Sequence, residues 1–252
     1  ETHHGYACSL IDRLTTAGHA PVGHSGQLYI YDPDEGIWIG KPTDALVRMV
    51  AEAYDGLGNC KRYNDYKNVA EHAISLASDP NFFADAPVGL ATQGGFYSIE
   101  TGELKVVPLS ADHRQRVKIG ITPEEQETPL FNQFLQETFA SSVPEVMEQQ
   151  LLLIQEVVGA IMLGNMHQFQ KAVMFYDPFG RAGKGTLERC IRELVPSTFV
   201  TAISPFNWSK EYYLASLAGA RLNVVGELPE HESIPAAAFK TVTGGDLLTG
   251  RH

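Results

Sequence analysis

The stretch Val173-Met174-Phe175-Tyr176-Asp177-Pro178-Phe179-Gly180-Arg181-Ala182-Gly183-Lys184-Gly185-Thr186 decides how the second half of this chain folds. Its apolar start predicts a buried strand at 173–176, followed by a glycine-containing loop, Gly-Lys and a helix. This is the order of a phosphate-binding P-loop, where backbone N–H groups and a helix N-terminus face an anion and a lysine reaches the outer phosphates of a nucleotide. The residues expected to bind the nucleotide are Gly180, Gly183, Lys184, Gly185 and Thr186.

The loop departs from the usual P-loop pattern at two positions. Pro178 stands where glycine is usual, and Gly185 stands where serine or threonine directly follows the lysine. Thr186, one residue later, is therefore the expected magnesium ligand in this loop. The alternative is a plain turn into a helix, with Lys184 in solvent, but a cation at a helix N-terminus is unfavourable unless an anion offsets it.

Downstream of the loop, the pattern predicts a helix at 187–194, a short strand at 198–202 and an apolar strand at 222–225 that leads to Glu227. In nucleotide hydrolases, a strand beside the P-loop strand delivers an acid to the magnesium ion or to the attacking water. Glu227 fits this role, both as the catalytic residue and as a magnesium ligand. The alternative is a surface glutamate at the end of a strand.

Three blocks in this order resemble the superfamily 3 helicases, specifically the C-terminal helicase part of phage, plasmid and poxvirus-type primase-helicases. The blocks are Gly-Arg-Ala-Gly-Lys-Gly-Thr at 180–186, Ala-Gly-Ala-Arg-Leu-Asn-Val-Val-Gly-Glu-Leu at 218–228, and Lys-Thr-Val-Thr-Gly-Gly-Asp-Leu-Leu-Thr-Gly-Arg at 240–251. Upstream, residues 90–104 resemble the strand, turn, strand signature of the domain that precedes the helicase in these proteins. Residues 129–139 resemble the helix after that domain, and residues 151–164 resemble the helix that leads into the P-loop strand.

The resemblance implies an ATP-dependent DNA helicase that acts in phage or plasmid replication. It implies ATP and Mg2+ as cofactors, single-stranded or forked DNA as partner, and a homo-oligomeric ring, a hexamer, as the assembly. Lys240 and Arg251 would bind DNA, because they fall in the family's third motif, near a DNA-facing hairpin. Gly226 departs from the family pattern, since some relatives place a first acid at that position.

Two other functional classes stay open. One is a P-loop small-molecule phosphotransferase, which would need a substrate pocket and a lid. The other is a nonhydrolysing DNA-binding or partner-docking module with a vestigial P-loop.

The periodicity and the resemblance together give three expected regions. They are an α+β N-terminal domain at 1–125, a helical connector at 126–170, and the front portion of a truncated α/β P-loop ATPase, AAA+-like and of superfamily 3 type, at 171–252. The chain starts at Glu1 and stops just after the third motif, so we expect a fragment that is catalytically incomplete when it is alone.

The N-terminal half is expected to contain two hairpins. The first joins 27–31 to 36–40 through Asp32-Pro33-Asp34-Glu35, where a turn accounts for Asp32 and Asp34 better than a metal site does. The second spans 95–108, with its turn at 100–102. Helices are expected at 44–54, 66–77, 130–140 and 144–162, and the polar stretch 110–128 is expected to be a linker.

Composition sets the broader limits. The chain has 252 residues, 44% of them hydrophobic, and a formal net charge of −11, which argues against a surface that grips duplex DNA nonspecifically. In a ring, a few basic residues in the pore would be enough to contact DNA. Three scattered cysteines fit a reducing, cytoplasmic compartment, and we expect no run to approach the length of a membrane-spanning helix. The cation–aromatic segment 61–67 is expected to be a solvated loop rather than a nucleic-acid contact.

Overall fold

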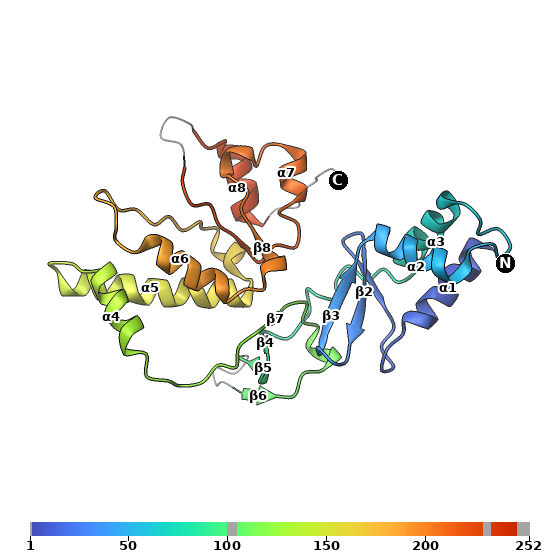
Figure 1. The fold of residues 1–252 in the computed structure, drawn as a ribbon, viewed down its shortest axis with the longest axis horizontal. Helices are drawn as coiled ribbons and strands as arrows, with labels where there is room; N and C mark the ends of the chain where they lie inside the picture. The colour runs from blue at the N-terminus through green and yellow to red at the C-terminus, as the bar shows by residue number, and fades with distance from the viewer. Residues whose placement is uncertain (1, 100–104, 229–232, 246–252) are drawn as a thin grey trace. The chain divides into compact units, whose positions relative to one another are not determined.

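In the computed structural model, the chain forms two compact units, Glu1–Lys118 and Ile119–His252, and each is described by itself (Figure 1). The structure describes residues 2–99, 105–228 and 233–245. Both units mix helices with short strands. The division falls inside the polar stretch expected to be a linker.

Three helices build the larger core of the first unit. They are α1 (His3–Leu14), α2 (Thr43–Tyr54) and α3 (Tyr63–Leu76), and α3 packs against both of the others. On α2, Leu46, Val50 and Tyr54 recur at helical spacing and are buried, which explains why this segment is an amphipathic helix. The predicted helices at 44–54 and 66–77 are confirmed, whereas α1 has no counterpart among the predicted elements.

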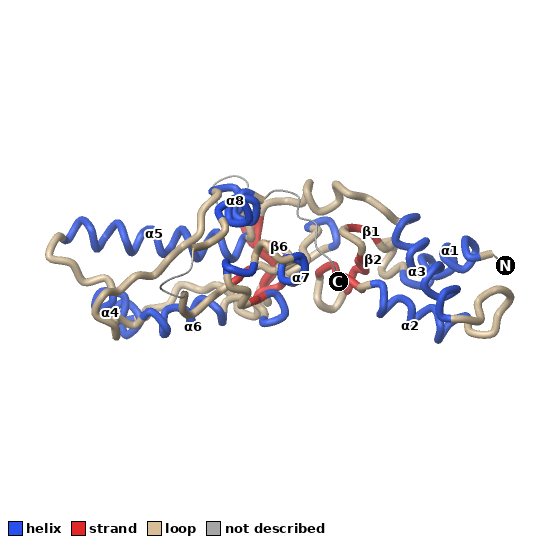
Figure 2. The backbone as a smooth tube through the Cα atoms, turned by 90° about the horizontal axis from the view of Figure 1, so that it is seen from above, coloured by secondary structure: helices blue, strands red, loops and turns tan. Residues whose placement is uncertain are grey.

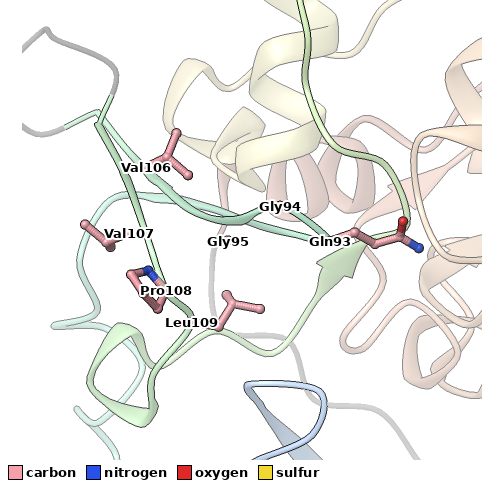
Figure 3. Close-up of a pocket in the computed structure, with 7 residues that line it drawn as sticks. All are labelled: Gln93, Gly94, Gly95, Val106, Val107, Pro108 and Leu109. Carbon is pink, nitrogen blue, oxygen red and sulfur yellow. The ribbon is translucent and has the colours of Figure 1, made fainter.

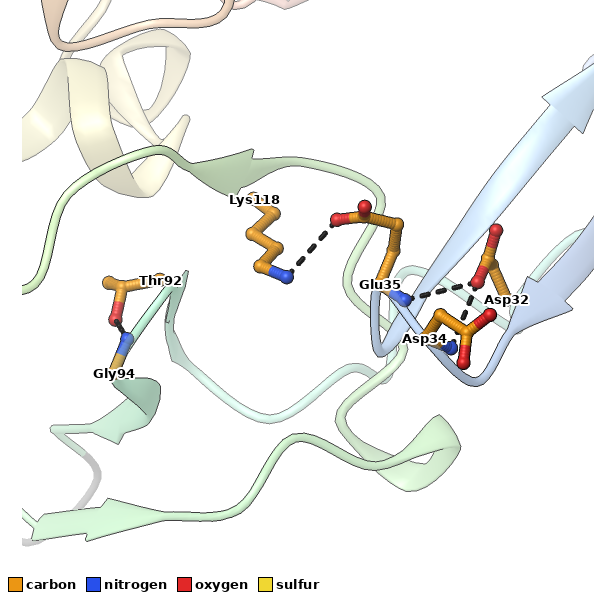
Figure 4. Close-up of polar contacts among 6 residues, drawn as sticks. All are labelled: Asp32, Asp34, Glu35, Thr92, Gly94 and Lys118. Carbon is orange, nitrogen blue, oxygen red and sulfur yellow. Dashed lines mark hydrogen bonds and ion pairs between the residues drawn. The ribbon is translucent and has the colours of Figure 1, made fainter.

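The first sheet contains β1 (Val22–His24), β2 (Gln27–Asp32) and β3 (Ile37–Lys41), all antiparallel. Asp32 Oδ1 accepts hydrogen bonds from the backbone N–H groups of Asp34 and Glu35, each at 3.0 Å (Figure 4). Gly36 closes the turn with a φ of 69°. The predicted hairpin is confirmed, and the Asp32 carboxylate takes part in its turn. The described residues contain no group of three or more metal-ligating side chains.

The second sheet has the strand order β6-β5-β4-β7. Its strands are β4 (Gly89–Thr92), β5 (Gly95–Ser98), β6 (Lys105–Val107) and β7 (Lys118–Ile119). Thr92 Oγ1 accepts a hydrogen bond from Gly94 N and donates one to Gly95 O, which fixes the β4–β5 turn (Figure 4). The predicted pairing within 95–108 is confirmed, and its turn at 100–102 lies outside the described residues.

The prediction of a linker at 110–128 is wrong for its first part. Ala111, Val117 and Ile119 are buried, and Trp38 Nε1 donates a hydrogen bond of 3.0 Å to Ala111 O. Lys118 also forms an ion pair of 3.1 Å with Glu35 (Figure 4). These apolar residues are spaced too irregularly to stand out in a polar stretch, and Ala111 is part of the core around Trp38.

A shallow hollow of about 440 Å³ lies along the edge formed by β5 and β6. Its lining residues are Gln93, Gly94, Gly95, Val106, Val107, Pro108 and Leu109 (Figure 3). Gln93 supplies the one polar side chain of this lining. The hollow therefore lacks the charged groups that nucleotide chemistry needs.

The second unit is mainly helical (Figure 2). Its elements are α4 (Pro129–Thr138), α5 (Pro144–Leu163), α6 (Lys184–Glu193), β8 (Val200–Thr201), α7 (Glu211–Ala215), β9 (Leu222–Asn223) and α8 (Ala236–Gly244). Its core joins Ile154, Val157 and Ile161 of α5 to Leu187 and Ile191 of α6. The predicted helices at 130–140, 144–162 and 187–194 are confirmed. Helix α8 ends at Gly244, and the φ of 72° at the following Gly245 is typical of a helix C-cap.

Helix α5 spans 20 residues, and its length and mean hydropathy of 1.4 would suit a membrane-spanning helix. The expectation that no run of the sequence reaches this length is therefore wrong. Apolar helices of bundle cores meet the same criterion, and here Ile154, Val157 and Ile161 pack into the core of the unit.

The predicted buried strand at 173–176 is wrong. These residues form no strand, and Val173, Met174 and Tyr176 are 42%, 74% and 79% exposed, while Phe175 alone of this run packs against the core. A buried parallel strand needs a neighbour on each side to satisfy its backbone groups. In the described residues β8 and β9 pair with each other instead.

The strands β8 and β9 are parallel, as expected for an α/β segment, but each is only two residues long. The Asn223 side chain holds them together: its Oδ1 accepts from Thr201 Oγ1 at 2.9 Å and from Ile203 N at 2.8 Å, and its Nδ2 donates to Ile203 O at 3.0 Å. Of the expected P-loop ATPase fold, the described residues thus contain a helix, α6, and a short parallel strand pair, and the ATPase assignment stays a prediction.

The core of the first unit gives a stability prediction. Leu46 is fully buried, so Leu46→Ala should lower the free energy of unfolding by about 2–5 kcal/mol through lost burial and a residual cavity. Leu57→Ala is the matched control, because Leu57 is 51% exposed, and it should change the free energy by less than about 0.5 kcal/mol. Urea denaturation followed by Trp fluorescence measures both, and equal effects would contradict the assigned core.

Candidate nucleotide-binding site

The loop before α6 is a tight, left-handed turn. Gly180, Arg181 and Gly183 have φ values of 74°, 66° and 81°. Gly183 is needed for a second reason: a Cβ atom there would lie 2.7 Å from Phe134 Cε2 and 3.0 Å from Thr138 Oγ1, so α4 packs directly against it. The glycines expected from the sequence therefore let the chain turn sharply into the helix.

Three donors of this loop converge on the carboxylate of Asp177. Its Oδ1 accepts from Phe179 N at 3.0 Å, and its Oδ2 accepts from Ala182 N at 3.3 Å and from Lys184 Nζ at 3.2 Å. The Asp177 side chain is 10% exposed and that of Lys184 is 37% exposed. The loop thus holds an anion already, and that anion belongs to the chain itself.

These contacts determine the ionisation of Asp177. The N–H of Phe179 is the largest cause that lowers its pKa below the usual value, and Lys184 and the N–H of Ala182 lower it further. Asp177 in turn offsets the unfavourable position of the Lys184 ammonium in the first turn of α6. Lys184 is thus paired within the loop while its side chain stays 37% exposed, and the alternative of a plain turn into a helix stays open.

A hollow of about 400 Å³ opens beside the loop. Its lining residues are Arg181, Ala182, Gly183, Lys184, Gly185, Thr186 and Arg189. Three of these residues are cationic and none is acidic, so the hollow is suited to an anion with several charges. The sequence predicts that Gly183, Lys184, Gly185 and Thr186 act together, and all four line this hollow. Gly180, the fifth predicted residue, forms part of the turn.

Two residues that line this hollow, Arg181 and Arg189, are absent from the set predicted from the sequence. Arg189 lies three residues after Thr186 and four after Gly185 on α6, a spacing that puts all of them on one side of the helix. Its Nε donates to Gly185 O at 3.2 Å and its Nη2 to Thr186 Oγ1 at 3.5 Å. The sequence signal for Arg189 was its spacing of three and four residues from Thr186 and Gly185 on the helix that follows the loop.

The described residues fit phosphate better than Mg2+. Magnesium prefers oxygen ligands, mainly carboxylates and water, and the Thr186 hydroxyl is the oxygen predicted for it here. That hydroxyl contacts the Arg189 guanidinium, whose charge repels a dication. A magnesium role for Thr186 or Glu227 finds no support in this geometry.

Glu227 lies four residues beyond β9, exposed and outside any helix or strand. In the described part of the chain it has no hydrogen bond or ion pair with Lys184 or Thr186. Because the strand at 173–176 does not form, the expected strand-to-strand route from the loop to Glu227 is absent. Its catalytic role stays a prediction.

The two residues predicted to bind DNA are placed only in part. Lys240 is exposed on α8. Arg251 lies outside the described residues. The structure therefore locates Lys240 alone, and DNA binding by Lys240 and Arg251 stays a prediction.

The Asp177 contacts predict a pH dependence. A carboxyl group with a lowered pKa in the folded state stabilises the loop above its unfolded pKa of about 4, and that stabilisation disappears as the pH falls through the lower folded value. Hydrogen-exchange protection of the Phe179 and Ala182 amides should therefore decrease below about pH 4 in the unaltered chain.

In Asp177→Asn, protection of these two amides should be low already at neutral pH, because the charged acceptor is gone. The Asp34 amide, which Asp32 binds in the first hairpin, is the internal control and should not respond to this substitution. Equal protection of Phe179 and Ala182 in both proteins would contradict the assigned contacts.

The comparisons with known proteins concern mainly the first unit. Comparison of the chain with curated proteins finds no match. A family model does match, over residues 23–140, and it is described as D5 N terminal like, D5_N. This domain is associated with primase-helicase proteins, which agrees with a replication-related role. Residues 23–140, a little under half of the chain, are thus similar to the D5 N terminal like domain.

Proposed function

We propose that this chain is part of an ATP-dependent DNA helicase of the primase-helicase type, in which the loop 177–186 binds the phosphates of ATP. Two independent features support the proposal. One is the D5_N-type domain at residues 23–140. The other is the set of cations around the N-terminus of α6, namely Arg181, Lys184 and Arg189, which lie outside the matched residues 23–140.

The observation that carries the proposal is the convergence of Lys184 Nζ and two loop N–H groups on one anion. A triphosphate has more charge and more acceptor oxygens than a carboxylate, so it is the stronger ligand for the same donors. Arg181 and Arg189 line the hollow beside them and would pair with the remaining phosphate oxygens. Asp177 would release its donors when the phosphates bind.

In this proposal, catalysis rests on positioning and charge. Lys184 and the two arginines would hold the phosphate oxygens and offset the negative charge that develops in the transition state. Glu227 would orient the attacking water as a general base. The expected partners are single-stranded or forked DNA, with several copies of the protein in a ring.

The second candidate is a nonhydrolysing DNA-binding or partner-docking module. One observation favours it: the loop donors and the Thr186 hydroxyl are already satisfied by Asp177 and Arg189. A vestigial loop of this kind would keep its own carboxylate and bind no nucleotide. Nucleotide affinity therefore separates the two candidates.

Replacing Lys184 tests the nucleotide site. Lys184→Ala should weaken binding of a fluorescent ATP analogue by about tenfold or more, because it removes a charge-assisted contact worth about 1.5–3 kcal/mol. Lys171→Ala is the matched control, since Lys171 is exposed and precedes the loop. The affinity of the Lys171→Ala protein for the ATP analogue should equal that of the unaltered chain.

Circular dichroism would establish that the Lys184→Ala and Lys171→Ala proteins are folded. If the unaltered chain binds the analogue and the folded Lys184→Ala protein binds it equally well, the site is elsewhere. No binding by any of the proteins would favour the nonhydrolysing module.

Replacing Glu227 tests the hydrolytic step. Glu227→Gln keeps the shape of the side chain and removes its charge, so ATP binding should stay near the unaltered value while turnover at saturating ATP falls by about 10²–10⁴-fold. Measurement of both in the presence of single-stranded DNA separates binding from chemistry. Lost binding with unchanged turnover per bound nucleotide would exclude the general-base role.

A further inference from the structure

Helix α7 exposes two adjacent tyrosine rings that the nucleotide site does not use. Tyr212 is 69% exposed and Tyr213 is 42% exposed, whereas Ala215 at the end of the same helix is buried. Exposed tyrosine rings combine a flat apolar surface with a polar tip. Successive residues of a helix point about 100° apart, so the two rings offer stacking faces on adjoining sides of α7.

A cation lies beside the Tyr213 ring. Lys210 Nζ is 5.6 Å from the centroid of the Tyr213 ring and donates a hydrogen bond of 2.9 Å to Asn207 Oδ1. These two contacts of Lys210 are both with uncharged groups. The ammonium is therefore held near this ring, with capacity for an anion.

The segment that carries this surface is firmly anchored. Trp208 is buried, its Nε1 donates to Ile203 O at 3.1 Å, and its ring stacks on Phe239 of α8 at 5.8 Å and 19°. Exposed Lys240 directly follows Phe239, so a second lysine lies one residue beyond the stacked pair.

We infer that Lys210, Tyr212 and Tyr213, together with Lys240, form a platform that binds single-stranded DNA. Bases would stack on the tyrosine rings and the lysines would pair with the phosphates, which is the arrangement of sequence-tolerant single-strand binding surfaces. The choice of DNA rests on the proposed helicase function; the stacking chemistry rests on the geometry of α7.

The other cation–aromatic segment, 61–67, is less suited to this role. Asp65 accepts from the backbone N–H groups of Lys61 and Arg62, and Lys67 pairs with Glu71 at 3.7 Å. These carboxylates would repel a phosphate backbone. The expectation of a solvated segment at 61–67 agrees with this charge distribution.

Fluorescence anisotropy with labelled oligo-dT tests the platform in the full chain. Tyr212→Ala should weaken binding by about tenfold, the loss expected for one stacked base, and Tyr212→Phe should restore it because the ring remains. Lys210→Ala should weaken binding and lower the dependence of affinity on salt. Tyr63→Ala is the matched control, since Tyr63 is a 63% exposed tyrosine of the other segment, and it should bind as the unaltered chain does.

Three results would overturn the inference: no binding of oligo-dT by the unaltered chain, equal binding by the Tyr212→Ala protein, or a loss in Tyr63→Ala instead. Titration of the same proteins with the ATP analogue separates this inference from the proposed function. A Tyr212-dependent affinity for oligo-dT without Lys184-dependent ATP binding supports the platform and rejects the helicase. The reverse result rejects the platform alone.

Discussion

The second unit depends on one electrostatic constraint, which is that Lys184 begins a helix. The N-terminus of α6 carries partial positive charge, and a lysine in its first turn adds a full one, so the arrangement needs an anion nearby. Asp177 supplies it and draws the N–H groups of Phe179 and Ala182 to the same point. The left-handed glycines, the contact of Gly183 with α4, and the hollow lined by Arg181 and Arg189 all follow from holding that loop closed.

Local patterns in the sequence predicted local structure well. Asp32 followed by Gly36 predicts a hairpin turn because an Asx contact and a left-handed glycine are both encoded within five residues. Helices with apolar residues three and four apart were equally evident, as on α2. The strand at 173–176 failed because its burial depends on partner strands far along the chain, which hydrophobicity alone does not specify. Arg189 was missed because its role appears only when α6 is considered as a surface.

The negative net charge and the proposed DNA-binding role are compatible because charge is distributed unevenly. The hollow beside α6 has three cations and no acid in its lining, and Lys210 lies beside a tyrosine ring with an amide as its polar contact. By contrast, the cations at 61–67 lie among carboxylates. Ligand recognition depends on these local balances, since charges more than about 10 Å apart are largely screened at moderate salt.

The Asp177 contact also explains why one geometry suits both a working and a vestigial nucleotide site. A carboxylate within the chain competes with a phosphate for the same donors, and its effective concentration is high because it is tethered only two residues before Phe179. A nucleotide binds only if its additional charges, paired with Arg181 and Arg189, outweigh that advantage. The two arginines, absent from the sequence-based prediction, are therefore the residues whose contribution decides between the two candidate functions.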